Sequence, residues 1–162
     1  MNEKEMKILK TAILNEVEGE SFYTLAADNS KSPDIKEALE FLASDEKKHQ
    51  QVLKKMLANI TEGQDNEVDF GQLGVVSPGI FKLQQAARMV DNLEITVIST
   101  AILMEKASMD FYRLAASQTS DPNAQELFEH LADWEIGHLD SLQETYDYLE
   151  AEWFDQQGFS PA

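Results

Sequence analysis

The chain has 162 residues, of which 43% are hydrophobic, and this length suits one domain, residues 1–162, with a sizeable core. It contains no cysteine, which excludes disulfides, iron–sulfur clusters and thiolate zinc sites, so any metal must use oxygen and nitrogen ligands. The formal net charge of −17 disfavours nucleic acids and anionic membranes as partners and favours the attraction of cations.

The N-terminus does not have the pattern of a targeting segment. Residues 1–5 are mostly charged and lack the basic-then-apolar order of a signal peptide. No apolar run along the chain approaches the ~20 residues that a membrane span needs. The sequence therefore predicts a cytoplasmic protein that does not enter a membrane.

Four long helices are predicted, because apolar residues recur at alternating spacings of three and four along four stretches of the chain. These stretches are residues 3–29, 33–61, 92–119 and 122–152. Ser32 and Asp121 are N-capping residues directly before a proline, which is favoured at the first helical position, so the second and fourth helices begin there. Asp91, with Glu94 three residues later, resembles a capping box that opens the third helix.

The segment between the second and third helices, residues 62–91, is the one long connection of the chain. It contains four glycines and Pro78, which are typical of turns and loops. Within it, a short amphipathic helix is expected over about residues 80–90.

The second half of the chain repeats the first at an offset of 89 residues. From Thr11 to Leu53, 18 of 43 positions are identical to their counterparts without a gap. The two units, about residues 3–61 and 92–152, each read as a helical hairpin. The predicted fold is therefore all-α, a four-helix bundle made of two repeated helical hairpins joined by a long crossover, which is the connectivity of ferritin-like folds.

Glutamates occupy four positions on the core-facing stripes where packing would place leucine. They are Glu16, Glu46, Glu105 and Glu135, and no lysine or arginine shares those stripes. An unpaired buried carboxylate costs several kcal/mol or takes up a proton, and four together repel one another. Two divalent cations between them would cancel the four negative charges.

Two Glu-x-x-His motifs complete the predicted metal site. His49 follows Glu46 by three residues, and His138 follows Glu135 in the same way. Residues three apart on a helix project from the same face, so each motif can anchor one ion, while the other two glutamates either cap an ion or bridge the pair. This is the pattern of di-iron and di-manganese bundles, and iron is the expected metal, with manganese or zinc as alternatives. The predicted ligands are Glu16, Glu46, His49, Glu105, Glu135 and His138.

These motifs, with Tyr23 and Tyr112 each seven residues after a stripe glutamate, resemble the rubrerythrin branch of the ferritin-like superfamily over nearly the whole chain. The resemblance implies that the six residues are di-iron ligands and that a reduced di-iron centre reacts with hydrogen peroxide or dioxygen. Rubrerythrins proper carry a rubredoxin domain with four cysteines, which this sequence lacks, so an external donor, a rubredoxin-like protein or a flavoprotein, must supply electrons. Their additional glutamate near the third-helix ligand is also missing, since Ile102 and Ser108 stand at those positions.

Other residues beside the motifs have more than one interpretation. Tyr23 and Tyr112 either hydrogen-bond a ligating carboxylate, act as redox-active neighbours, or are simply core residues. Glu20 is either an extra acidic group near the metals or a glutamate at the edge of the stripe. Asp45 would orient a histidine across the bundle, and because its counterpart in the repeat is Trp134, the two metal sites are expected to be unequal.

The expected function is that of a di-iron oxidoreductase, a peroxidase or oxidase, with a role in oxidative stress. The alternatives are a ferroxidase that handles iron and a non-catalytic metal-binding bundle, which share the same ligands. Because each hairpin carries half of the ligand set, the site can form within one chain or between the chains of a domain-swapped dimer. A homodimer is expected in either case.

Overall fold

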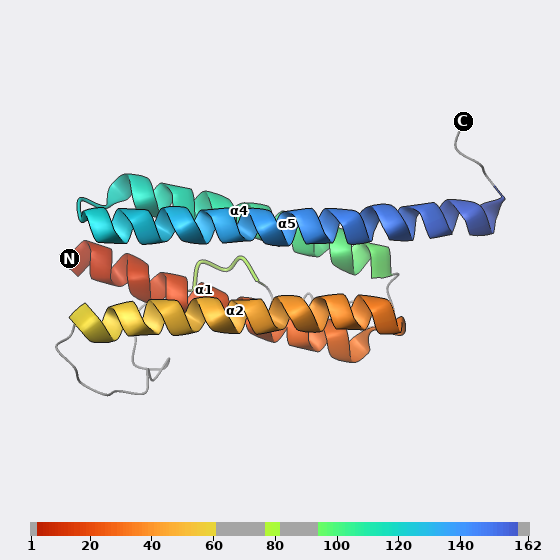
Figure 1. Ribbon diagram of the computed structural model, residues 1–162, viewed down its shortest axis with the longest axis horizontal. Coiled ribbons are helices and arrows are strands. Elements are labelled where there is room, and N and C mark those ends of the chain that lie inside the picture. Colours follow the sequence, from red (N-terminus) through yellow and green to blue (C-terminus); the bar gives the residue numbers. More distant parts are fainter. Residues whose placement is uncertain (1–2, 61–76, 82–93, 159–162) are drawn as a thin grey trace.

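The computed structural model describes residues 3–60, 77–81 and 94–158. Within these residues the chain forms four long helices, which confirms the predicted all-α bundle. The helices are α1 (Glu3–Asn29), α2 (Pro33–Ile60), α4 (Glu94–Gln118) and α5 (Pro122–Gln157). α1 and α2 form one hairpin, α4 and α5 form the other, and the two hairpins lie lengthwise beside each other (Figure 1).

The helix ends lie within two residues of the predicted ones, except at the end of α5. As predicted, Asp121 is the N-cap of α5, and its carboxylate accepts hydrogen bonds from the backbone N–H groups of Asn123 and Ala124 at 3.0 and 3.2 Å. α5 continues to Gln157, beyond the predicted end at residue 152, and projects past the other helices (Figure 1). It ends at Gly158, whose φ of 73° is the left-handed conformation that glycine adopts without strain.

Two predictions about the crossover fall mainly on residues outside the described ranges. The Asp91 end of the predicted capping box lies outside them, as does the short helix predicted over residues 80–90, apart from its first two residues. Those two, Ile80 and Phe81, are not helical. Phe81 packs against the rings of Phe22 and Tyr23, with centroids 5.9 and 6.0 Å away, so this part of the crossover covers α1.

The repeat also appears as a reciprocal pair of contacts between the hairpins. Glu5 of α1 accepts hydrogen bonds from the turn between α4 and α5, including one of 2.7 Å from the backbone N–H of Ser120. Glu94, its counterpart 89 residues later, accepts hydrogen bonds from the turn between α1 and α2, including one of 2.8 Å from the backbone N–H of Ser32. A glutamate at the start of each hairpin therefore accepts hydrogen bonds from the turn of the other hairpin. The sequence alone does not predict these contacts.

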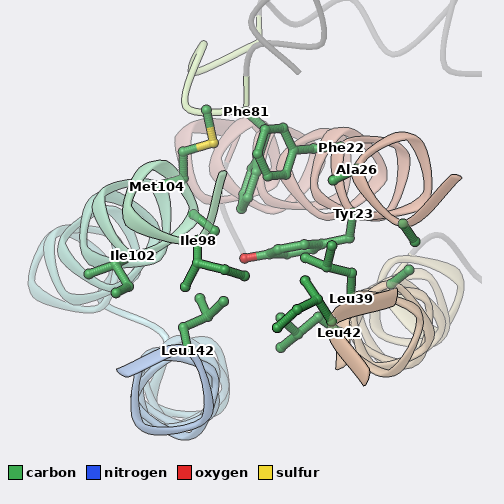
Figure 2. Packing of buried hydrophobic residues seen from close by; sticks show 14 residues of the cluster. Phe22, Tyr23, Ala26, Leu39, Leu42, Phe81, Ile98, Ile102, Met104 and Leu142 are labelled. Atoms are coloured by element: carbon green, nitrogen blue, oxygen red, sulfur yellow. The ribbon is translucent and has the colours of Figure 1, made fainter. Parts of the chain in front are cut away.

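The apolar core forms two clusters. One contains Phe22, Tyr23, Phe81 and Leu142, and Figure 2 shows the Tyr23 ring crossing the middle of it with its hydroxyl pointing inward. The other lies around Leu9 near the start of α1. Within the described residues, no helix is long and apolar enough to cross a bilayer.

Candidate metal centre

The six predicted ligands meet in the interior of the bundle, one from each of α1 and α4 and two from each of α2 and α5. Each is at most 5% exposed, although all six are polar or charged. Helical periodicity explains the pairs within one helix, since residues three apart share a face. His49 Nδ1 lies 3.4 Å from a Glu46 carboxylate oxygen, and His138 Nδ1 lies 3.1 Å from one of Glu135.

The ligand atoms form overlapping groups in which the donor atoms lie within 4.8 Å of one another. Two groups have four members and are called the ligand sets: Glu16, Glu46, His49 and Glu135, and Glu46, Glu105, Glu135 and His138. A third group, His49, Glu135 and His138, joins the two sets. Glu46 and Glu135 belong to both ligand sets and would therefore be shared if two ions were bound. Glu16 and Glu105 each belong to one ligand set and would each serve a single ion. The spacing of the glutamates along the chain leaves both roles open to either pair.

The cluster has the unmet bonding capacity that a cation would satisfy. Among the described residues, both carboxylate oxygens of Glu46 and one each of Glu105 and Glu135 are buried without a hydrogen-bond partner. A buried, unpaired carboxylate oxygen costs free energy unless it is bonded or coordinates a metal. Oxygen and imidazole donors suit iron, manganese or zinc, so these residues fit the pair of ions that the sequence predicts.

The electrostatics of the metal-free cluster also favour uptake of positive charge. Burial raises the pKa of Glu16, Glu46 and Glu135 well above the usual value, and neighbouring carboxylates raise it further. Burial lowers the pKa of His138, but contacts with Glu105 and Glu135, at 3.4 and 3.1 Å, outweigh this and raise it to about 12. The metal-free protein therefore holds extra protons, which a metal must displace.

Both tyrosines predicted to lie near the metals donate hydrogen bonds to ligand-set carboxylates. Tyr23 donates to Glu105, and Tyr112 donates to Glu16, so each hydroxyl reaches the glutamate of the other hairpin. Asn15, which the sequence analysis missed, donates through Nδ2 to the Tyr112 oxygen at 3.4 Å. In the sequence, the one indication of this role is that Asn15 directly precedes the predicted ligand Glu16 on α1.

Glu20, the suggested extra ligand, lies outside the cluster. Its carboxylate accepts a hydrogen bond of 2.7 Å from the Gln50 side chain, and its other oxygen lies 3.9 Å from the Lys47 ammonium. It is half-buried and belongs to neither ligand set. The structure therefore favours the interpretation of Glu20 as a stripe-edge residue.

A surface cavity of about 510 Å³ between α2 and α5 reaches the cluster at its two histidines. His49 and His138 line it, together with Phe41, Asp45 and Trp134 among others. A small molecule can therefore approach the imidazoles from solvent along this face.

Residues 7–146, most of the chain, match the family model described as Rubrerythrin. The chain belongs to the rubrerythrin family. This membership implies the ferritin-like superfamily and a non-haem di-iron protein. A solved structure described as a hypothetical protein from Pyrococcus furiosus is similar to this rubrerythrin-family chain, with 28% identity and a TM-score of 0.67, over 92% of this chain and 91% of that one. No curated protein matches the sequence.

Gly19 leaves space for the Glu46 carboxylate in this member of the family. A Cβ at Gly19 would lie 3.1 Å from Glu46 Cδ and Oε1 and 3.3 Å from the Phe81 ring, closer than ordinary van der Waals contact. We therefore expect Gly19→Ala to displace Glu46 and to weaken metal binding by about tenfold, in the range of changes that reorient a ligand. Competition with a chromophoric chelator measures this affinity.

Gly137→Ala is the matched control, because a Cβ there would meet no atom within 4 Å. It should leave the affinity unchanged and stabilise α5 by ~0.5–1 kcal/mol, the usual gain of alanine over glycine within a helix. An unchanged affinity in Gly19→Ala would mean that Glu46 moves aside without cost.

Proposed function

We propose that the protein is a non-haem di-iron oxidoreductase that reduces hydrogen peroxide or dioxygen with electrons from an external donor. The observation that supports this most is the pair of buried ligand sets that share Glu46 and Glu135 and reach a solvent cavity through His49 and His138. A purely structural metal site is typically closed, whereas a catalytic site keeps an accessible position.

Each ligand has a role in this proposal that follows from its place. Glu46 and Glu135 would bridge the two ions, and Glu16 and Glu105 would cap one ion each. The histidines would be neutral nitrogen donors, one to each half. Iron, when bound, supplies the electrons and the open coordination positions at which a small oxidant reacts.

The tyrosines are placed to orient the capping carboxylates and to hold protons beside them. Burial, with the charge of Glu105 next, raises the pKa of Tyr23 well above its usual value, so its hydroxyl stays protonated and acts as a donor. Reduction of peroxide to water consumes a pair of electrons and a pair of protons. Tyr23 and Tyr112 lie at the cluster where those protons are needed.

The donor of electrons would be a rubredoxin-like protein or a flavoprotein, since this sequence has no cysteine to form a rubredoxin-type centre.

We place the protein in the cytoplasm. We also expect a homodimer, which the exposed aromatic rings of Tyr148, Trp153 and Phe154 in the C-terminal part of α5 favour. Light scattering that gives the mass of a monomer would contradict the dimer. The two hairpins of one chain bring the six residues together, which favours sites within one chain over a domain swap.

The reaction is tested by reducing iron-loaded protein without oxygen, removing the reductant, and adding one equivalent of peroxide or of dioxygen. Stopped-flow absorbance should show oxidation of the iron, faster with peroxide if the protein is a peroxidase. Zinc-loaded protein is the control, because zinc fills the site without redox chemistry. Release of ferric iron when excess ferrous ion is the reductant would favour the ferroxidase alternative, and no oxidation by either oxidant would refute the proposal.

A further inference from the structure

The two histidines of the cluster have different neighbours, although the repeat aligns them. The difference comes from one pair of counterpart positions, Asp45 on α2 and Trp134 on α5. Each of these side chains lies against the histidine of the other hairpin. The two halves of the centre therefore differ in what supports the imidazole rather than in the ligands themselves.

His138 has a carboxylate at its outer nitrogen. Its Nδ1 faces the ligand glutamates, and its Nε2 lies 3.8 Å from Asp45 Oδ2, which is longer than a hydrogen bond but places a carboxylate beside the outer nitrogen. The other oxygen of Asp45 is held by the Lys48 ammonium at 2.5 Å. An acceptor at the outer nitrogen of a ligating histidine fixes its tautomer and raises its basicity, and loss of such an acceptor typically costs 10–100-fold in metal affinity.

His49 has an aromatic ring where His138 has the carboxylate. The Trp134 indole stacks on the His49 imidazole with centroids 4.6 Å apart and planes 18° apart. Stacking orients the ring, but it offers no acceptor, and no described side chain hydrogen-bonds His49 Nε2. Trp134 is 40% exposed, and both it and His49 line the cavity between α2 and α5.

The repeat differs again at the next turn along the same helices. Lys48, which holds Asp45, has Gly137 as its counterpart. Glycine has no side chain, and the space around Gly137 is open, so nothing at that position holds Trp134 in the way that Lys48 holds Asp45. His49 therefore lacks both a carboxylate at its outer nitrogen and a counterpart of the lysine that holds that carboxylate.

We propose that the two halves of the centre bind metal with unequal strength and in a set order. The Glu105–His138 half, beside Asp45, binds more tightly and fills first, and the Glu16–His49 half, beside Trp134, binds more weakly and fills second. The expected difference in affinity is about 10–100-fold, the usual effect of an outer carboxylate on a ligating histidine. This inference rests on the proposed role of the cluster as a two-metal site.

Zinc provides a test that does not depend on activity, because it is diamagnetic and redox-inert. The chain has three histidines, so the ring nitrogens of ¹⁵N-labelled protein give three sets of NMR signals. His130 is an internal control, because its side chain is 62% exposed and belongs to neither ligand set. We expect the first equivalent of zinc to shift His138, the second to shift His49, and neither to shift His130.

Variants separate the proposal from a general disturbance of the fold. Asp45→Asn should weaken the first step and erase the order, whereas Trp134→Asp, which places a carboxylate at the counterpart position, should strengthen the second. Asp133→Asn is the matched control, since Asp133 lines the same cavity but, among the described residues, makes no hydrogen bond or ion pair with either histidine, and it should leave both steps unchanged. If Trp134→Asp does not fold by circular dichroism, Trp134→Phe, which keeps a stacked ring, should preserve the wild-type order.

Two failures are distinguishable. If zinc shifts His49 and His138 together, or His49 first, the proposed order is wrong while the two-metal site stands. If zinc shifts neither, the cluster is not a metal site and the proposed function fails with it. An equal loss in both steps for Asp45→Asn would also overturn the order, because the effect of Asp45 would then not be specific to His138.

Discussion

Glu46→Ala is expected to abolish binding of both ions, because its carboxylate belongs to both ligand sets. Glu16→Ala should instead retain one ion, since Glu16 belongs to one set only. Metal analysis of iron-loaded, desalted protein gives the stoichiometry directly, and two ions still bound after Glu46→Ala would refute the assignment.

Two further variants make this result interpretable. Glu40→Ala is the matched control on α2, because the Glu40 side chain is 59% exposed and, among the described residues, forms a surface ion pair with Lys36 alone. It should bind two ions with unchanged stability. Metal-free Glu46→Ala should be at least as stable as metal-free wild type, because it removes one of four mutually repelling buried carboxylates. Loss of metal therefore cannot be attributed to unfolding.

Metal removal is expected to lower the melting temperature by about 10 °C, and by more as the pH rises. Binding at a free metal concentration ~1,000-fold above Kd stabilises the folded state by about 4 kcal/mol, and each kcal/mol shifts the melting temperature of a domain of this size by about 2–4 °C. Circular dichroism of chelated and zinc-loaded protein at pH 6 and pH 8 measures both effects.

The sign of the pH dependence follows from the raised pKa values of the cluster. Glu16, Glu46 and Glu135 have a higher pKa in the folded than in the unfolded chain, so their contribution is fully present below about pH 4.3 and is lost as the pH rises through the folded value. The pKa of His138, raised to about 12, acts in the same direction above about pH 6.5. Metal-free protein should therefore be less stable at pH 8 than at pH 6.

The gap between the two melting curves should widen over the same range, because metal displaces these protons. Calorimetry in two buffers of different ionisation enthalpy should show proton release on zinc binding at pH 6. Equal melting curves of loaded and demonstrably metal-free protein at both pH values would mean that the carboxylates do not lie together.

The sequence by itself was sufficient to predict the four helices and the hairpin repeat, and to select the six polar residues that meet in the interior. Helical periodicity determines which face of a helix a residue occupies, and a glutamate on an apolar face is conspicuous because burial of an unpaired charge is costly. The 89-residue repeat made the pattern specific, since two Glu-x-x-His motifs in register are much rarer than one. These are local properties, which the order of residues along one helix determines.

Only the tertiary structure decided how these residues pair across the bundle. Periodicity could not show that Glu46 and Glu135 are shared by both sets, or that Tyr23 donates to Glu105 rather than to a neighbour on its own helix. It also could not show that Glu20 turns toward Gln50. Such contacts depend on the rotation of each helix about its axis, on side-chain rotamers and on which helices lie opposite, and these follow from packing of the whole core rather than from spacing in one segment.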